Sequence, residues 1–374
     1  MKLQRTNRLR ALAVGAIAVS GALVLTSCGS DDNSQNPKSD TAQAAKNIKC
    51  DGKGKLLASG SSAQKNAVDA WVKNYQGACD GTQINYKDIG SGGGVQEWLQ
   101  GTTAFAGSDA ALKPDEVAAS KKVCKSGQGI NLPMLGGPVA VSYNLSGVDD
   151  LVLDAPTLAK IFDSKIKKWN DPEIKKLNPD ANLPSTDIQA FHRSDESGTT
   201  QNLSQYLGDS APDAWKYEAD KSWPAKGGQS ASGSAGVAQQ VKQTEGAIGY
   251  FELSYAEANS LNSVKIDTGA KKPVEATSEN ASKAIADAEI VGKGKDLALE
   301  LNYKTKAEGA YPIVLVTYEI ACDKGNKKET LDATKSFLNY AASEDGQSIL
   351  SEIGYAPLPD EIAEKVRKTI PELA

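Results

Sequence analysis

The chain has 374 residues, of which 24% are charged, and its formal net charge at pH 7 is −5. This acidic balance argues against a nucleic-acid-binding protein, because such proteins neutralise phosphates with an excess of lysine and arginine. One histidine and five cysteines without a CxxC spacing also argue against a metal centre. We therefore expect no nucleic acid, no metal and no cofactor.

The N-terminus has the pattern of a lipoprotein signal peptide, which we assign to residues 1–27. Four basic residues precede an apolar run from Ala11 to Leu25. This run of about 15 residues is shorter than the roughly 20 that a spanning helix needs. Small residues precede Cys28, so we expect cleavage before Cys28 and lipidation of this residue. An uncleaved membrane anchor is the alternative, although no cationic stop-transfer segment follows the run.

Residues 28–49 are predicted to be a flexible tether between the lipid anchor and a folded body. They are rich in Ser, Asp, Asn, Gln and Lys, and no large apolar residue occurs before Ile48. Such a segment cannot build a core, and a coil of this length spans roughly 25 Å. Cleavage would also remove four positive charges and change the net charge from −5 to −9. An anionic ligand would then have to be held by local donors, because the overall field repels it.

The remaining body of about 320 residues exceeds the size at which one hydrophobic core usually divides, so we expect two lobes. Strand-like apolar runs alternate with helix-like runs along it, which predicts an α/β fold with mostly parallel sheets. The predicted strands include residues 55–60, 84–90, 102–109, 134–145 and 311–323, and the predicted helices include residues 62–76, 93–101, 154–165, 199–208 and one or two within 330–359.

Four cysteines remain in this body, and an even number in an exported protein suggests two disulfide bonds. Three pairings are possible. Because Cys50 and Cys79 bracket one predicted strand and helix, we favour a bond between them. Cys124 would then pair with Cys322, which lies far away in the sequence.

Two serine-containing turns stand between a predicted strand and a predicted helix. In ASGSSAQ, residues 58–64, Ser62 can cap the following helix while neighbouring amides point outward. In DIGSGGGV, residues 88–95, Ser91 precedes three glycines whose missing Cβ atoms would let a ligand approach the backbone. The glycines match neither GxGxxG nor a P-loop. Each turn alone is also compatible with an ordinary capped helix.

The segment FAGSDAAL, residues 105–112, places Asp109 at the end of a predicted strand. A carboxylate beside an anion is favourable if the anion carries a proton that it can donate. Phosphate at neutral pH carries at least one proton, whereas sulfate has none, so a single Asp109 could select phosphate. The alternative is a surface or helix-capping acid.

The segment RSDESGTT, residues 193–200, concentrates donors for a tetrahedral oxyanion. Arg193 offers a planar fork of N–H groups, while Ser197 and Thr199 add hydroxyls and amides at the start of a predicted helix. The alternative is a capped helix with a surface ion pair between Arg193 and Asp195.

In order, these segments resemble the phosphate-binding protein of the bacterial high-affinity phosphate ABC transporter. The resemblance extends from about Leu56 to Ile370 and includes IGSGGGV, FAGSDAAL, LDAPTLAKIFDSKIKKWNDPEIKKLNP, HRSDESGTT, EGAIGYFELSYA and YAPLP. It implies a two-lobed α/β periplasmic-binding-protein clamshell of a type II-like kind. Each lobe would have a mixed, mostly parallel sheet flanked by helices, and two hinge crossovers would join the lobes. Domain I would comprise residues 50–142 and 314–374, and domain II residues 143–313.

The resemblance also implies which residues enclose the phosphate and what the protein does with it. Asp195 would hold Arg193 in place. The chain would be a non-enzymatic, lipid-anchored receptor outside the cytoplasm that delivers phosphate to membrane permease subunits driven by a cytoplasmic ATPase, and we expect a monomer. The implied phosphate ligands are Ser62, the amide of Ala63, Ser91, Asp109, Arg193, Ser197, Gly198 and Thr199.

Three departures from the family pattern accompany this resemblance. Ser62-Ala63 stands where Thr-Phe is common, so an aromatic wall is lost. Glu196 replaces a frequent Gly and adds a negative charge, and we expect its side chain to point into solvent. His192 beside Arg193 receives no role.

Two rival functions remain open. One is a secreted phosphoryl-transfer enzyme or serine hydrolase with Ser197 as nucleophile, although Ser197 lies outside a GxSxG motif and His192 is the only possible histidine base. The other is a receptor for sulfate, molybdate or arsenate. Asp109 disfavours sulfate, whereas arsenate is protonated like phosphate and could still fit.

Overall fold

A computed structural model describes residues 48–374 of the chain. The predicted signal peptide, the lipidation site at Cys28 and almost all of the predicted tether lie outside these residues. Within residues 48–374, no helix is both long enough and apolar enough to cross a membrane.

The first part of the described chain follows the predicted alternation of strands and helices. Apolar residues recur at helix spacing in the first helix, which buries Ala67, Val68, Trp71 and Tyr75 on one face. The elements are β1 (Gly54–Gly60), α2 (Lys65–Ala78), β2 (Thr82–Lys87), α3 (Ser91–Leu99), β3 (Phe105–Ser108), α4 (Pro114–Val123), β4 (Gly129–Asn144), β5 (Val152–Asp154), α5 (Ala155–Phe162) and α6 (Pro172–Leu177).

The second part ends in helices, as predicted. The stretch 330–359 contains two of them, because the Ser343 side chain accepts the amide of Gly346 and starts a new helix. The elements are β6 (Gln189–Arg193), α7 (Gly198–Ser210), β7 (Gln229–Ala231), α8 (Gly233–Gln243), β8 (Ala247–Glu252), α9 (Leu253–Asn259), β9 (Asn262–Ser263), β10 (Lys265–Asp267), α10 (Ser278–Ile285), β11 (Glu289–Ile290), β12 (Leu299–Glu300), β13 (Val314–Cys322), α11 (Lys328–Ala341), α12 (Glu344–Ser348) and α13 (Asp360–Thr369).

A nine-stranded mixed sheet runs through two domains. The first domain has the strand order β2-β1-β3-β13-β4, and the second continues as β4-β8-β6-β7, with β9 paired to β4. Strand β4 belongs to both domains, because residues up to Pro138 pair with β13 and residues from Val139 onward pair with β8. The predicted two-domain α/β architecture is confirmed.

The predicted mixed sheet is confirmed, although its parallel pairs lie among the outer strands and its central pairs are antiparallel. Strand β1 is parallel to β2 and β3, and β6 is parallel to β7 and β8. The central strands β4 and β13 are antiparallel to each other, β13 is antiparallel to β3, and β4 is antiparallel to β8. The reason is topological: β4 takes the chain from the first domain to the second, and β13 lies where the chain returns.

Both disulfide bonds favoured from the sequence are present, Cys50–Cys79 and Cys124–Cys322. The first joins the segment before β1 to the end of α2, and the second joins the end of α4 to the end of β13. Both lie in the first domain. Neither bond therefore restrains the two domains relative to each other.

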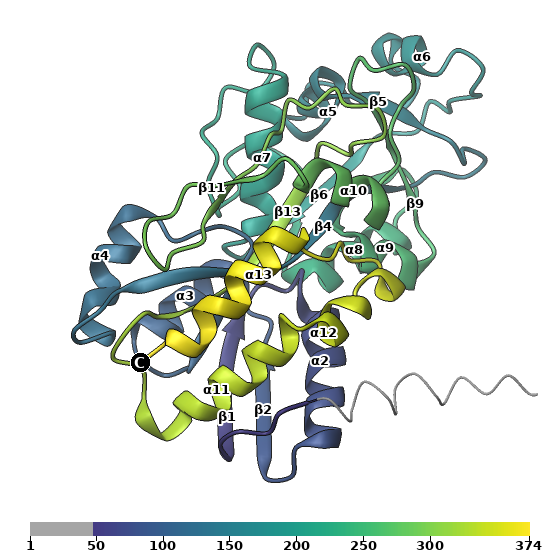
Figure 1. Cartoon of the computed structure of the whole chain (residues 1–374). Helices are drawn as coiled ribbons and strands as arrows, with labels where there is room; N and C mark the ends of the chain where they lie inside the picture. The colour runs from purple at the N-terminus through teal and green to yellow at the C-terminus, as the bar shows by residue number, and fades with distance from the viewer. Residues whose placement is uncertain (1–47) are drawn as a thin grey trace, which may run out of the picture. The chain divides into compact units, whose positions relative to one another are not determined.

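Helices pack against the faces of the sheet in both domains. Figure 1 shows α11 and α13 crossing in front of the first domain, where α11 contacts β1 and α13 contacts β4. In the second domain, α8 packs against β8 and β6. The segments that follow β3 and β6 meet between the two domains, where Thr199 contacts Asp109.

Candidate anion-binding site

Five segments meet between the two domains, and each follows the carboxyl end of a strand. In the first domain these are residues 61–64 after β1, residues 88–90 after β2, and Asp109 after β3. In the second domain they are residues 194–197 after β6 and Ser232 after β7. Carboxyl ends of parallel strands are the usual location of ligand sites in α/β proteins. The topology thus brings the separately predicted loops to one place.

The hydroxyl of Ser91, at the start of α3, connects the two domains. It accepts a hydrogen bond from the amide of Gly198 at 3.0 Å and another from the amide of Asp109 at 3.2 Å. The hydroxyl of Thr199 donates to Oδ2 of Asp109 at 2.9 Å. Four predicted site residues from three loops therefore form one connected cluster.

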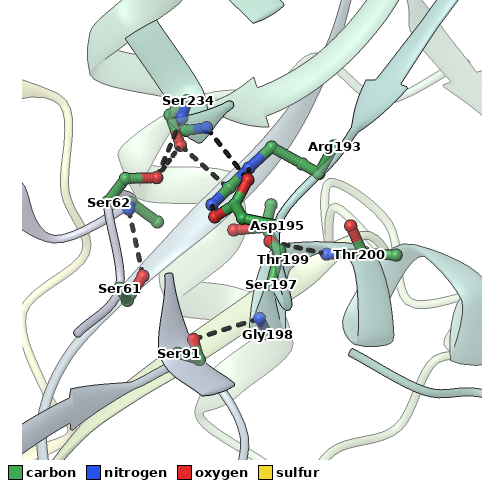
Figure 2. A network of polar contacts seen from close by, with 12 residues as sticks. Ser61, Ser62, Ser91, Arg193, Asp195, Ser197, Gly198, Thr199, Thr200 and Ser234 are labelled. Carbon is green, nitrogen blue, oxygen red and sulfur yellow. Dashed lines mark hydrogen bonds and ion pairs between the residues drawn. The ribbon is translucent and has the colours of Figure 1, made fainter. Parts of the chain in front are cut away.

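Arg193 and Asp195 form a second cluster in the second domain (Figure 2). The buried guanidinium of Arg193 donates from Nε to Asp195 Oδ1 at 2.8 Å and from Nη2 to Oδ2. Asp195 also accepts the amide of Gly233 at 3.0 Å. Nη1 of Arg193 lies 3.5 Å from the hydroxyl of Ser234. Because Asp195 engages Nε and Nη2, and Nη1 makes only one long hydrogen bond to Ser234, Nη1 is the part of the guanidinium best suited to donate to an anion.

The side chain of Ser62 reaches from the first domain to the start of α8, as Figure 2 shows. Its Oγ accepts the amide of Ser234 at 2.8 Å and lies 3.0 Å from the Ser234 hydroxyl. The adjacent amide of Ala63 instead donates to Oγ of Ser61 at 3.0 Å within the same loop. Ser62 is thus part of the interdomain contact, whereas the Ala63 amide makes a local bond.

Ser197 begins α7 as its N-cap, with its Oγ accepting the amide of Thr200 at 3.2 Å. The hydroxyl of Thr200 lies 2.6 Å from the hydroxyl of Tyr250, which fixes the first turn against the sheet. The amides of Gly198 and Thr199 stand at the positive end of this 13-residue helix. This geometry favours a negatively charged group in front of the helix.

The glycines of the 88–95 loop make room for the second domain. Gly90 has a φ of +87°, and a Cβ atom there would lie 2.4 Å from Oδ2 of Asp195. A Cβ atom on Gly92 would lie 2.1 Å from Oε2 of Glu196. The sequence predicts that the glycines after Ser91 let a ligand approach the backbone. In the structure, Gly90 and Gly92 make room for Asp195 and Glu196. Glu196 is exposed, as expected, but it rests against Gly92.

The two carboxyl groups of the site have opposite pKa shifts. Burial raises the pKa of Asp109, and hydrogen bonds, including those from Thr199 and Thr317, oppose this effect only in part. Burial also disfavours ionisation of Asp195, but the hydrogen bonds and charge of Arg193 outweigh it and hold the Asp195 pKa below its usual value. Asp195 is therefore a fixed counter-ion of Arg193, whereas Asp109 is suited to share a proton.

Comparisons with known proteins show the family to which the chain belongs. A family model described as a PBP superfamily domain matches residues 34–345. Phosphate-binding protein PstS 3 of Mycobacterium tuberculosis H37Rv is 43% identical over 373 residues, covering 99% of this chain and 100% of that protein. PstS 2 of the same strain is 39% identical over 365 residues, with coverages of 96% and 98%. The chain belongs to the phosphate-binding PstS family.

A solved structure shows the same fold. The crystal structure of a putative phosphate ABC transporter substrate-binding protein from Clostridium perfringens, with bound phosphate, matches with a TM-score of 0.60 at 21% identity. The match covers 82% of this PstS family member and 100% of the other chain. It confirms the predicted periplasmic-binding-protein fold.

Two contact residues of this PstS family member escaped the sequence analysis. Ser234 contacts both Ser62 and Arg193, and the hydroxyl of Thr317 donates to Oδ1 of Asp109 at 3.0 Å. A signal existed for each. Ser234 lies in SASGSAG, where a strand is followed by Ser-Gly-Ser and a helix, and Thr317 is a polar residue within the apolar run of β13.

The rival enzyme site finds no support in the geometry. The ring of His192 stacks on Trp223 with centroids 4.9 Å apart, and its Nδ1 lies 3.0 Å from the carbonyl oxygen of Arg193. Ser197 uses its Oγ as the cap of α7. His192 is thus not placed as the base for Ser197. Among residues 48–374 of this PstS family member, no three metal-binding side chains are grouped to hold an ion.

Glu319 is a buried carboxyl group of β13 behind the site, in the first domain. Its side chain is 1% exposed. Burial raises its pKa to about 8, and the Asp109 carboxylate adds to the shift while the Gln64 amide opposes it. The folded protein therefore keeps Glu319 protonated at pH values where the unfolded chain, with a pKa near 4.5, ionises.

Glu319→Gln is expected to flatten the pH dependence of stability. In the wild type, the free energy of unfolding should fall by a few kcal/mol, on the order of 1.4 kcal/mol per pH unit, between pH ~4.5 and ~8, because the unfolded chain releases the proton that the folded chain retains. The glutamine variant lacks this loss. Urea unfolding at several pH values checks it, with the exposed Glu289→Gln as control. Parallel wild-type and Glu319→Gln profiles would contradict the assignment.

Proposed function

We propose that the chain is a lipid-anchored receptor on the extracytoplasmic face of the cell membrane that binds inorganic phosphate between its domains. It would deliver phosphate to the permease subunits of an ABC transporter, which a cytoplasmic ATPase drives. The observation that best supports this proposal is the position of Asp109. This buried carboxyl group lies inside an interdomain network of amides and hydroxyls, and the positive charge of Arg193 acts on it. The phosphate-binding names of its relatives support the same ligand.

The proposed ligands already contact one another across the domain interface. Phosphate would replace these internal bonds, taking the Ser91 and Thr199 hydroxyls and the α7 amides as donors while Asp109 accepts its proton. Because donors and acceptor enclose the anion together, binding would favour the closed arrangement of the domains. The full proposed set is Ser62, Ala63, Ser91, Asp109, Arg193, Ser197, Gly198 and Thr199, with Asp195 orienting Arg193.

The domain division fits a clamshell that closes on this site. We propose residues 50–142 and 314–374 as domain I and residues 143–313 as domain II. The change of β4 partners after Pro138 and the start of β13 at Val314 support this division. We further propose that the chain acts as a monomer. We also propose that it has no catalytic activity, because His192 stacks on Trp223 and Ser197 caps α7.

The N-terminal assignments complete the proposal. Residues 1–27 would be removed as a signal peptide, Cys28 would be lipidated, and residues 28–49 would tether the domains to the membrane. Mass spectrometry of the membrane fraction would detect a lipid on Cys28, and Cys28→Ala would release the protein from the membrane.

Calorimetric titration tests the ligand. The body lacking residues 1–28, stripped of bound anion, is titrated with phosphate and then sulfate at neutral pH. We expect tight one-to-one binding of phosphate and no heat from sulfate. If a folded sample gave no heat of binding with either anion, the receptor function would be rejected. A phosphoesterase assay of wild type and Ser197→Ala would then test the enzyme alternative.

A further inference from the structure

Two ion pairs connect the domains outside the proposed ligand set. Nζ of Lys221 lies 2.7 Å from Oε1 of Glu116, and Nζ of Lys113 lies 2.6 Å from Oδ2 of Asp220. Lys113 and Glu116 stand at the start of α4 in the first domain, while Asp220 and Lys221 lie between α7 and β7 in the second. The consecutive residues Asp220 and Lys221, which have opposite charges, thus contact Lys113 and Glu116 of the other domain.

The Glu116–Lys221 pair joins a buried lysine to a partly buried glutamate, and its geometry is well defined. Lys221 is only 3% exposed. Oε2 of Glu116 accepts the amide of Lys113 at 2.8 Å, so that both oxygens of this carboxylate are engaged. A lysine charge removed from water is costly unless it is paired, so separation of the domains would strand or expose it. The more exposed Lys113–Asp220 pair contributes less, because solvent screens it.

Each side of this contact is directly linked to a proposed ligand. Lys113 follows Asp109 by only four residues. On the other domain, the carbonyl oxygen of Lys221 accepts the amide of Ser197 at 2.8 Å. The ion pair therefore joins the segment that presents Asp109 to the segment that presents the Ser197–Thr199 turn.

We propose that Glu116 and Lys221 are positioning residues for anion binding, whose ion pair holds the Ser197–Thr199 turn against Asp109 and slows opening of the domains. The inference rests on the proposed function, but it concerns two residues that do not belong to the ligand set. It predicts an effect mainly on the rate at which phosphate leaves.

Charge reversal in the full-length protein in detergent tests the pair. Glu116→Lys and Lys221→Glu each place like charges together, and the double variant restores an opposite-charge pair. We expect each single variant to bind phosphate at least tenfold more weakly through faster dissociation, and the double variant to return to within about threefold of wild type. Glu116→Gln, a milder change, should lie between them. Asp187→Lys is the matched control, because it breaks the 2.7 Å Lys168–Asp187 pair within one domain.

A second readout does not depend on phosphate. Amide hydrogen exchange of residues 197–203 should accelerate in the single variants and slow again in the double variant. Single variants that bind and exchange like wild type, or a double variant no better than the weaker single variant, would overturn the proposal. If the wild type binds no phosphate, the proposed function fails, and the exchange pattern alone decides the role of the pair.

Discussion

Arg193→Ala is expected to weaken phosphate binding by about 2–5 kcal/mol, or roughly 30-fold to several thousandfold. The loss has two physical sources. The anion loses the Nη1 donors, and Asp195 loses both of its guanidinium hydrogen bonds. The Asp195 carboxylate would then face a bound anion with only backbone amides, including that of Gly233, as donors. Titration calorimetry of folded wild type and variant measures the difference directly.

A double variant separates the two sources. Arg193→Ala combined with Asp195→Asn removes the unpaired carboxylate, so we expect it to bind phosphate more tightly than Arg193→Ala alone, though still more weakly than wild type. Arg193→Lys keeps the charge but loses the planar fork, and should show an intermediate loss. A change below about half a kcal/mol in Arg193→Ala would place this side chain outside the site.

Local sequence patterns were sufficient to predict the helices on which the site residues lie. Helix α2 follows from the spacing of its apolar residues, and the start of α7 follows from the capping side chain of Ser197. The Arg193–Asp195 pair could be predicted because only one residue, Ser194, separates the two in the sequence. Interactions of this kind depend on nearby residues, and the sequence presents them directly.

Contacts between segments that are distant in the sequence could not be predicted from such local patterns. Ser234 lies in a Ser-Gly-Ser turn, but the strand before this turn, β7, has three residues and no apolar run, so the strand–turn–helix pattern was incomplete in the sequence. Strand β4 is antiparallel to β13 because the chain passes to the second domain through β4 and returns at β13. Hydrophobic runs in the sequence do not contain this information. The Glu116–Lys221 pair joins residues 105 positions apart, and each alone resembles an ordinary surface charge.

Asp109→Asn is expected to change both affinity and selectivity. Its carboxylate accepts the hydroxyls of Thr199 and Thr317 and, in the proposed complex, the proton of phosphate. An asparagine presents an N–H group where phosphate needs an acceptor, which should cost about 1–3 kcal/mol, or roughly 5- to 150-fold in affinity. The same N–H group can donate to sulfate, so measurable sulfate binding should appear.

Thr317→Val is the matched control for this selectivity. It removes one hydrogen bond to Asp109 and leaves the carboxylate in place, so phosphate affinity should change modestly while sulfate rejection persists. Competition titrations with phosphate, arsenate and sulfate distinguish the variants. Arsenate, which is protonated like phosphate, should lose affinity in parallel with it in Asp109→Asn. If Asp109→Asn kept wild-type phosphate affinity and still rejected sulfate, selectivity would have to arise from the donors around Arg193, since Asp109 would then make no proton-dependent contact.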